Sequence, residues 1–143
     1  MEIRIQAEAL NPWQAIIDYQ SAHAELEGRY GGLSVFIGAM RDLNDGEAVR
    51  AMTLEHYPGM TEKFLQRVSE EASEEWDIID SLVVHRYGEL APGDPIVLVA
   101  VWSAHRAEAF AACRYIIDEL KTRAPFWKNE TTPEGRRWVT RKS

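Results

Sequence analysis

Two apolar segments of the chain are separated by only a short turn. The segments IIDSLVVHRYG (78–88) and DPIVLVAVWSA (94–104) flank Pro92-Gly93-Asp94, a combination typical of a tight turn. Strands joined by so short a connection pair antiparallel, because a parallel pair needs a crossover of a dozen or more residues. The chain therefore cannot form a doubly wound parallel sheet, and an α+β fold with a mixed or antiparallel sheet is predicted.

The remaining elements alternate with this pair of strands in the approximate order βαββαββαββ. Period-2 alternation or glycine-bounded apolar runs predict strands at EIRIQ (2–6), GGLSVFIGAM (31–40), AMTLEHY (51–57), FWKNE (126–130) and RRWVT (136–140). Three main helices are predicted: one capped by Asn11-Pro12 and ending near Gly28, one over residues 61–76, and one from about residue 103 to 121. The first helix carries Trp13, Ile16, Ile17 and Gln20 on one side.

Length and charge narrow the class of protein. The 143 residues fit one domain, taken here as residues 1–143. A net charge of −7 argues against a nucleic-acid binder, which needs a basic face. No apolar run approaches the length of a membrane span and MEIRIQAEAL does not read as a signal peptide, so a cytoplasmic location is expected. The single cysteine excludes an internal disulfide, and the four histidines form no metal motif.

The start of the third helix carries an unusual pair of cations. Ser103 is a good N-cap, which would leave His105 and Arg106 in the first turn, where positive charge opposes the helix dipole. Together with free N–H groups these side chains would make an anion site. The alternative is that both lie in solvent or pair with Glu108. The residues alone leave these two interpretations open.

The buried side of the third helix is predicted to carry Phe110, Cys113, Ile117 and Leu120, which recur at helical spacing. Cys113 is therefore interpreted as a small core residue and not as a reactive thiol.

A second group of cations lies in the segment KTRAPFWKNE (121–130). Lys121, Arg123 and Lys128 stand close in sequence to Phe126 and Trp127. Aromatic side chains that exclude water and neighbouring like charge both favour a neutral lysine, which can act as acid, base or nucleophile. A solvated basic loop is the alternative.

Distance constrains any site that uses both groups. In a continuous helix, His105 and Lys121 are separated by about 24 Å, since each residue rises about 1.5 Å. We therefore infer that a site containing both is shared between two copies of the chain, in a homodimer with two composite sites.

Several motifs resemble a known family, the large catalytic subunit of molybdopterin synthase. They are TLEHYPGM (53–60), GELAPGD (88–94), SAHR (103–106), LKTRAPFWK (120–128) and TPEGRRWV (132–139). The resemblance implies an α/β hammerhead fold and a central homodimer within a heterotetramer. At each end a small ubiquitin-like carrier would insert its C-terminal Gly-Gly thiocarboxylate into this chain. The implied reaction transfers two sulfurs to cyclic pyranopterin monophosphate (precursor Z), giving the dithiolene of molybdopterin for the molybdenum cofactor, with no cofactor bound to the enzyme.

The resemblance also implies roles for individual residues. Lys121 and Lys128 would be the catalytic pair, and Arg41, His105 and Arg106 would bind the substrate's phosphate and pterin. The pocket would be lined by Ala39, Met40, Asn129 and Glu130. Relatives often carry basic residues in place of Ala39 and Asn129, which leaves those two side chains in doubt.

Other interpretations stay open from the residues. Arg41 could simply pair with Asp42 or Asp45, and residues 41–50 could be a mobile lid or a plain hairpin loop. The role of Arg141 and Lys142 is not defined by the sequence. A non-catalytic dimeric scaffold for a Gly-Gly tail, or a sensor of a phosphorylated metabolite, would need only part of the same set of residues.

Overall fold

The computed structural model describes residues 1–44, 47–48, 51–123, 126–132 and 135–139, and for 43–44, 47–48, 126–132 and 136–139 it describes the backbone only. Its main sheet contains β1 (Glu2–Gln6), β6 (Asp80–Arg86), β8 (Pro95–Ser103) and β2 (Gly32–Ala39), in the order β1-β6-β8-β2. β1 and β6 pair parallel, whereas β6–β8 and β8–β2 pair antiparallel. The predicted α+β fold with a mixed sheet is confirmed.

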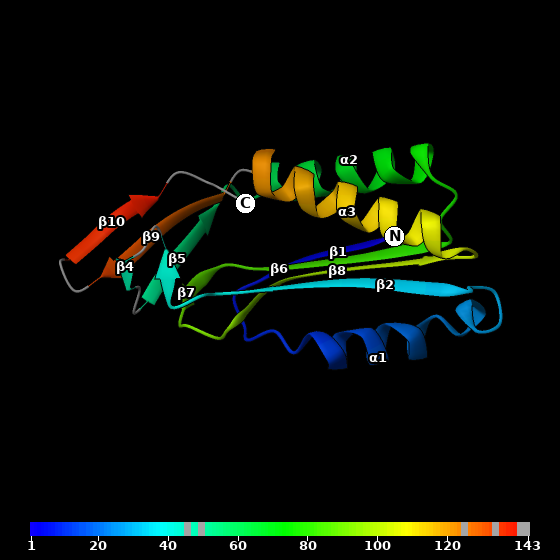
Figure 1. The fold of residues 1–143 in the computed structure, drawn as a ribbon, viewed down its shortest axis with the longest axis horizontal. Coiled ribbons are helices and arrows are strands. Elements are labelled where there is room, and N and C mark those ends of the chain that lie inside the picture. Colours follow the sequence, from blue (N-terminus) through cyan, green and yellow to red (C-terminus); the bar gives the residue numbers. More distant parts are fainter. Residues whose placement is uncertain (45–46, 49–50, 124–125, 133–134, 140–143) are drawn as a thin grey trace.

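Helices cover both faces of this sheet. α1 (Pro12–Ala22) lies on one face, and α2 (Met60–Glu75) and α3 (Arg106–Arg123) lie side by side on the other (Figure 1). Side chains of β6 and β8 alternate between two hydrophobic clusters: Leu82, Val84, Leu98, Ala100 and Trp102 belong to the α1 side, and Val83, Val97, Val99 and Val101 belong to the α2–α3 side. Burial on both faces explains why these strands read as nearly continuous apolar runs.

A second sheet extends the molecule beyond one end of the first (Figure 1). It contains β10 (Gly135–Val139), β9 (Phe126–Thr132), β5 (Ala51–His56) and β7 (Gly88–Leu90), in that order and all antiparallel. The short strand β7 was not predicted, because three residues are too few to show a period. β3 (Leu43–Asn44) pairs antiparallel with β4 (Glu47–Ala48), so the described part of segment 41–50 is a hairpin.

The first helix differs in part from the prediction. Its start is confirmed, since the Asn11 side chain accepts a hydrogen bond from the Gln14 N–H and Pro12 is the first helical residue. It ends at Ala22, not near Gly28, and a 3-10 turn (Ala24–Leu26) follows. Its buried residues are Pro12, Ile16 and Tyr19, whereas Trp13 and Ile17 are exposed by 64% and 56%.

The third helix also begins later than predicted, at Arg106. Ser103 is the last residue of β8, and its hydroxyl donates to the Asp77 carbonyl at 2.9 Å, so it is not simply a helix cap. Phe110 was predicted to be buried but is 64% exposed. The buried face runs through Ala109, Ala112, Cys113, Ile116, Ile117 and Leu120, because small alanines let the helix lie close to the sheet and turn Phe110 outward.

No helix in the described part of the chain is both long enough and apolar enough to cross a membrane.

Candidate functional site

Lys121 lies in the last turn of α3, next to an aromatic ring of the main sheet. Its side chain is half-buried, and its Nζ atom is 5.9 Å from the centroid of the Phe36 ring, within the range of a cation–π contact. Phe36 belongs to β2. The site prediction did not include Phe36. One sequence signal was available: Gly38 shares its face of the strand and leaves room for a large ring, since a Cβ there would lie 3.2 Å from the ring.

Arg123, the third cation of the segment 121–130, pairs with carboxylates of two helices. Its guanidinium is paired with Glu119 at 2.9 Å and with Glu71 of α2 at 3.7 Å, and it lies 5.5 Å from the Phe64 ring centroid. Hydrogen bonding to Glu119 raises the pKa of Arg123. Arg123 therefore joins α3 to α2 and is not aimed at the same place as Lys121.

The predicted substrate-binding segment 39–41 lies at the end of β2. The register shifts between Gly38 and Ala39, and Ala39 is exposed. Met40 is buried, whereas the Arg41 side chain is exposed. An open cavity of about 560 Å³ is lined here by Met40, Arg41, Asp42, Pro92 and Gly93. A cation at the rim of an open cavity suits an anionic ligand.

The strand β9 brings the remaining predicted residues to the second sheet. Lys128, Asn129 and Glu130 pair in register with Leu54, Thr53 and Met52 of β5. Their side chains lie outside the described part of the structure.

One hydrophobic cluster connects these elements. It contains Met40, Leu54 and Leu120. Arg41 and Lys121 directly follow two of these residues in the sequence, and Lys128 pairs with the third. The cluster therefore anchors the backbone beside each of these three cations.

His105 and Arg106 lie at the opposite end of α3. Both side chains are exposed, and the described residues include no ion pair between either of them and Glu108. The His105 N–H donates to Ser103 Oγ at 3.4 Å, and the His105 carbonyl accepts from the Ala109 N–H at 3.3 Å. The helix is continuous over Arg106–Arg123, so the separation of about 24 Å from Lys121 stands. One chain does not bring the two ends together.

Cys113 is confirmed as a core residue. It is 4% exposed, and burial raises the pKa of its thiol, which disfavours the nucleophilic thiolate. The described residues hold no group of three or more histidine, cysteine or carboxylate side chains able to bind a metal ion. Arg141 and Lys142, whose role the sequence left open, lie outside the described residues.

Comparison with known proteins identifies the family of this chain. A sequence model of the MoaE protein family matches residues 7–123, most of the chain. The chain belongs to the MoaE family. The catalytic subunit of molybdopterin synthase from Pseudomonas aeruginosa is 50% identical over 97% of this chain and 90% of its own length. The Ralstonia nicotianae catalytic subunit is 60% identical over 76% of this chain, which spans 62% of that protein.

A solved structure agrees with the fold throughout. The molybdopterin biosynthesis MoaE protein from Burkholderia ambifaria superposes with a TM-score of 0.81 at 47% identity, covering 99% of this chain and 90% of that one. The MoaE fold therefore includes the second sheet as well as the main sheet and its helices.

Proposed function

We propose that this chain is the catalytic subunit of a molybdopterin synthase, a sulfurtransferase that converts cyclic pyranopterin monophosphate to molybdopterin. The observation that carries the proposal is its membership of the MoaE family, with catalytic subunits of that synthase 50% and 60% identical to it. Arg41, which lines the 560 Å³ cavity, supports the same function, since the substrate phosphate is an anion.

The sulfur donor in this proposal is a small ubiquitin-like carrier ending in a Gly-Gly thiocarboxylate. Its sulfur attacks an electrophilic carbon of the substrate's side ring and forms a C–S bond, while a C–O bond of that carbon breaks and the leaving oxygen takes the electron pair and a proton. Water then cleaves the acyl C–S bond, so the sulfur stays on the pterin and the carrier leaves with an ordinary carboxylate. A second carrier delivers the second sulfur. No catalytic cysteine is required, which is consistent with the burial of Cys113.

We assign Lys121 and Lys128 as the catalytic pair. Lys121 stabilises the negative charge that develops on the acyl oxygen, and Lys128 assists proton transfer. Arg41 binds the substrate phosphate. The backbone of Ala39 and Met40 and the segment containing Asn129 and Glu130 line the pocket, as the resemblance implies.

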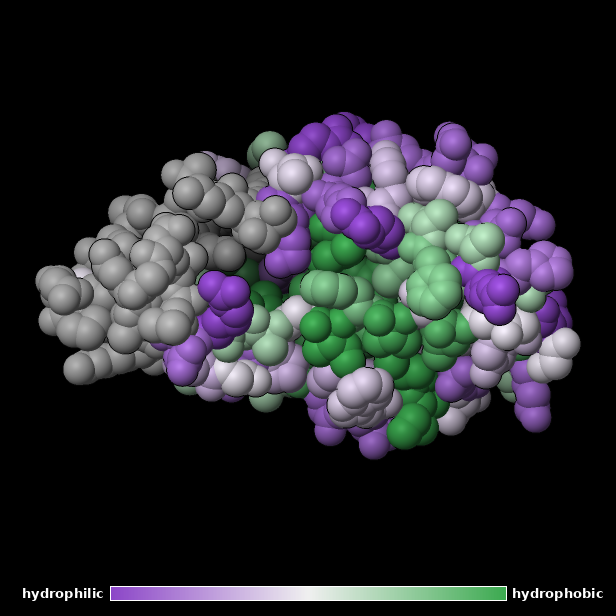
Figure 2. Space-filling view, in the orientation of Figure 1, coloured by the Kyte–Doolittle hydropathy of each residue, from purple (hydrophilic) through white to green (hydrophobic). Residues whose placement is uncertain are grey.

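His105 and Arg106 enter the same site from a second copy of the chain. β2 is an edge strand of the main sheet, and Figure 2 shows a broad hydrophobic surface over this strand between α1 and α3. These three elements carry half-buried or exposed apolar side chains, namely Trp13, Ile17, Leu33, Val35, Ile37 and Phe110. An unpaired apolar edge of this kind favours association with another strand.

The length of β2 supports the composite site. A Cβ on Gly32 would lie 3.6 Å from Arg106 Cα, so one end of β2 adjoins the 105–106 pair, and Ala39 to Arg41 follow at its other end. Two β2 strands paired antiparallel about a twofold axis at their middle would bring the Gly32 end of one beside the Ala39 end of the other. His105 and Arg106 of the second copy would then approach this chain's Arg41.

Reconstitution tests both parts of the proposal. Thiocarboxylated carrier and cyclic pyranopterin monophosphate are added, and the dithiolene product is measured. Lys121→Ala and Lys128→Ala should reduce turnover far more than carrier affinity. Mixed dimers of His105→Ala and Lys121→Ala chains are made by co-expression or by refolding the two chains together. These dimers should recover part of the activity that each variant lacks alone. No dithiolene from the wild-type chain would refute the enzyme function, and no recovery in verified mixed dimers would refute the shared site.

A further inference from the structure

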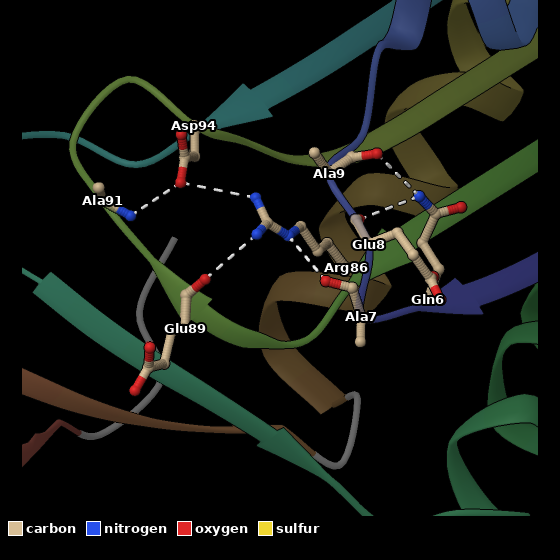
Figure 3. Close-up of polar contacts among 8 residues, drawn as sticks. All are labelled: Gln6, Ala7, Glu8, Ala9, Arg86, Glu89, Ala91 and Asp94. Atoms are coloured by element: carbon tan, nitrogen blue, oxygen red, sulfur yellow. Dashed lines mark hydrogen bonds and ion pairs between the residues drawn. The ribbon is translucent and has the colours of Figure 1, made fainter.

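Arg86, at the end of β6, contacts two backbone carbonyls and one carboxylate (Figure 3). Its Nε donates to the Ala7 carbonyl at 3.2 Å, and one terminal nitrogen donates to the Glu89 carbonyl at 3.3 Å. The other terminal nitrogen lies 3.5 Å from Asp94 Oδ2. The Arg86 side chain is 15% exposed and that of Asp94 is 38% exposed, so Arg86 is largely covered while the ion pair is only partly shielded from water.

Asp94 in turn fixes the turn between β7 and β8. The same carboxylate oxygen accepts a hydrogen bond from the Ala91 N–H at 2.9 Å, which closes the turn on itself. The Asp94 carbonyl accepts from the Met40 N–H at 2.9 Å, and the Gly93 N–H donates to the Met40 carbonyl at 2.8 Å. The turn therefore binds both backbone polar groups of Met40, the residue before Arg41.

These bonds hold the two walls of one cavity together. Its lining comes from residues 40–42 on one side and from Pro92 and Gly93 on the other. Met40 is 6% exposed and packs into the core, so the backbone leading to Arg41 is fixed by both hydrogen bonds and packing. The direction in which Arg41 leaves that backbone thus depends on the turn, and through it on Asp94 and Arg86.

We propose that Arg86 and Asp94 are positioning residues that hold Arg41 at the cavity for the substrate's phosphate. This inference rests on the proposed function, which supplies the ligand. Neither residue touches the substrate. A side chain that binds an anion loses affinity when its supporting backbone shifts, even when its own charge is unchanged.

Binding and kinetics of four chains test the proposal: wild type, Asp94→Ala, Arg41→Ala and the double variant. Asp94→Ala should raise KM for cyclic pyranopterin monophosphate by about tenfold, within the range for coupled neighbours, and leave kcat within about twofold. In the Arg41→Ala background the same change should have no further effect on KM. Asp94→Asn should recover most of the affinity, because an amide oxygen can still accept from Ala91.

A matched control separates positioning from a general loss of charge. Asp118→Ala removes one partner of the exposed Arg114–Asp118 pair on α3 and should leave KM and kcat unchanged. Arg86→Lys keeps the positive charge but removes the guanidinium group, whose three nitrogens reach three partners. This variant should raise KM as Asp94→Ala does. If Asp94→Ala does not fold, Arg86→Lys with and without Arg41→Ala provides the same cycle.

Two results would overturn the inference. One is a KM for the pterin phosphate unchanged in Asp94→Ala and Arg86→Lys. The other is an equal rise with and without Arg41, which would indicate a loss unrelated to that side chain. Titration calorimetry with the pterin phosphate alone, without carrier, distinguishes this failure from failure of the proposed function. A wild-type chain that binds the ligand but forms no dithiolene would refute the function and leave the positioning testable.

Discussion

The ammonium group of Lys121 lies 5.9 Å from the centre of the Phe36 ring. This contact joins the last turn of α3 to the middle of β2, an edge strand of the main sheet, on the sheet face that α3 covers (Figure 1). An aromatic face attracts a cation and limits the directions that a flexible lysine can take. Phe36 therefore holds the proposed catalytic ammonium near the end of the helix.

Replacing the ring should reduce turnover through Lys121. Phe36→Leu removes the cation–π contact, worth about 0.5–1 kcal/mol at a partly exposed site, so we expect kcat to fall about 2- to 5-fold at saturating substrate. Phe36→Tyr keeps a ring and should stay near wild type. Phe64→Leu is a matched control, since Phe64 makes the equivalent contact with Arg123. Equal losses in Phe36→Leu and Phe64→Leu, after correction for stability, would contradict this role.

The sequence predicted the elements well where local signals agree. The alternation at residues 2–6 and the Asn11-Pro12 cap defined β1 and the start of α1 correctly. The sequence-based prediction failed where tertiary packing determines which side of a helix is buried. Phe110 fits a helical stripe, but the alanines at 109 and 112 determine which face approaches the sheet. Propensity and period cannot show that choice, because it depends on the shape of the opposing strands.

In the candidate site, too, local geometry could be predicted from the sequence and long-range contacts could not. The separation of His105 from Lys121 follows from helix geometry alone and holds in the structure. The pairing of Arg123 with Glu71 could not be predicted, because those residues are far apart in sequence and meet only when α2 packs on α3. The hydrogen bond from Met40 to Asp94 is also long-range, although Arg86 and Asp94 are close in sequence.

Gly31 is expected to be required for the placement of the 105–106 pair. A Cβ at Gly31 would lie 2.2 Å from the Ala104 carbonyl oxygen, so Gly31→Ala must displace the backbone that leads into His105 and Arg106. We expect a loss of about 1–3 kcal/mol, lowering Tm by several degrees, and a raised KM for the pterin phosphate. The neighbouring Gly32→Ala is the control, because its Cβ would meet Arg106 Cα at an ordinary 3.6 Å. Similar Tm and KM values for the two variants would contradict the argument.

Asp80 is expected to make stability fall in acid. Burial, the largest single influence, raises the pKa of Asp80, but hydrogen bonds from the Met1 ammonium (2.6 Å), the Tyr19 hydroxyl (2.8 Å) and the Ser81 N–H (2.8 Å) together hold it below its usual value. Because the folded pKa is the lower one, this stabilisation is present above about pH 4 and is lost as pH falls through the folded pKa.

Urea unfolding at two pH values checks this expectation. Asp80→Asn should cost about 2 kcal/mol at pH 7, since it removes a charged acceptor of several hydrogen bonds, and the difference from wild type should shrink at pH 2.5. Tyr19→Phe removes one donor and should show a smaller change of the same sign. A difference between wild type and Asp80→Asn that is independent of pH would show that the carboxylate charge is not responsible.

Cys113 should be chemically silent in the folded protein. The side chain is 4% exposed, its Sγ lies 3.8 Å from the Val99 carbonyl oxygen, and burial raises the pKa of the thiol, so little thiolate is available. We expect a maleimide or disulfide reagent to label Cys113 rapidly in denaturant and only at the rate of unfolding in its absence. Cys113→Ala should cost about 1 kcal/mol through a small cavity and keep dithiolene formation within about twofold of wild type. Rapid labelling of the folded chain together with loss of turnover would instead make this thiol part of the sulfur-transfer reaction, contrary to the mechanism in which the carrier alone delivers the sulfur.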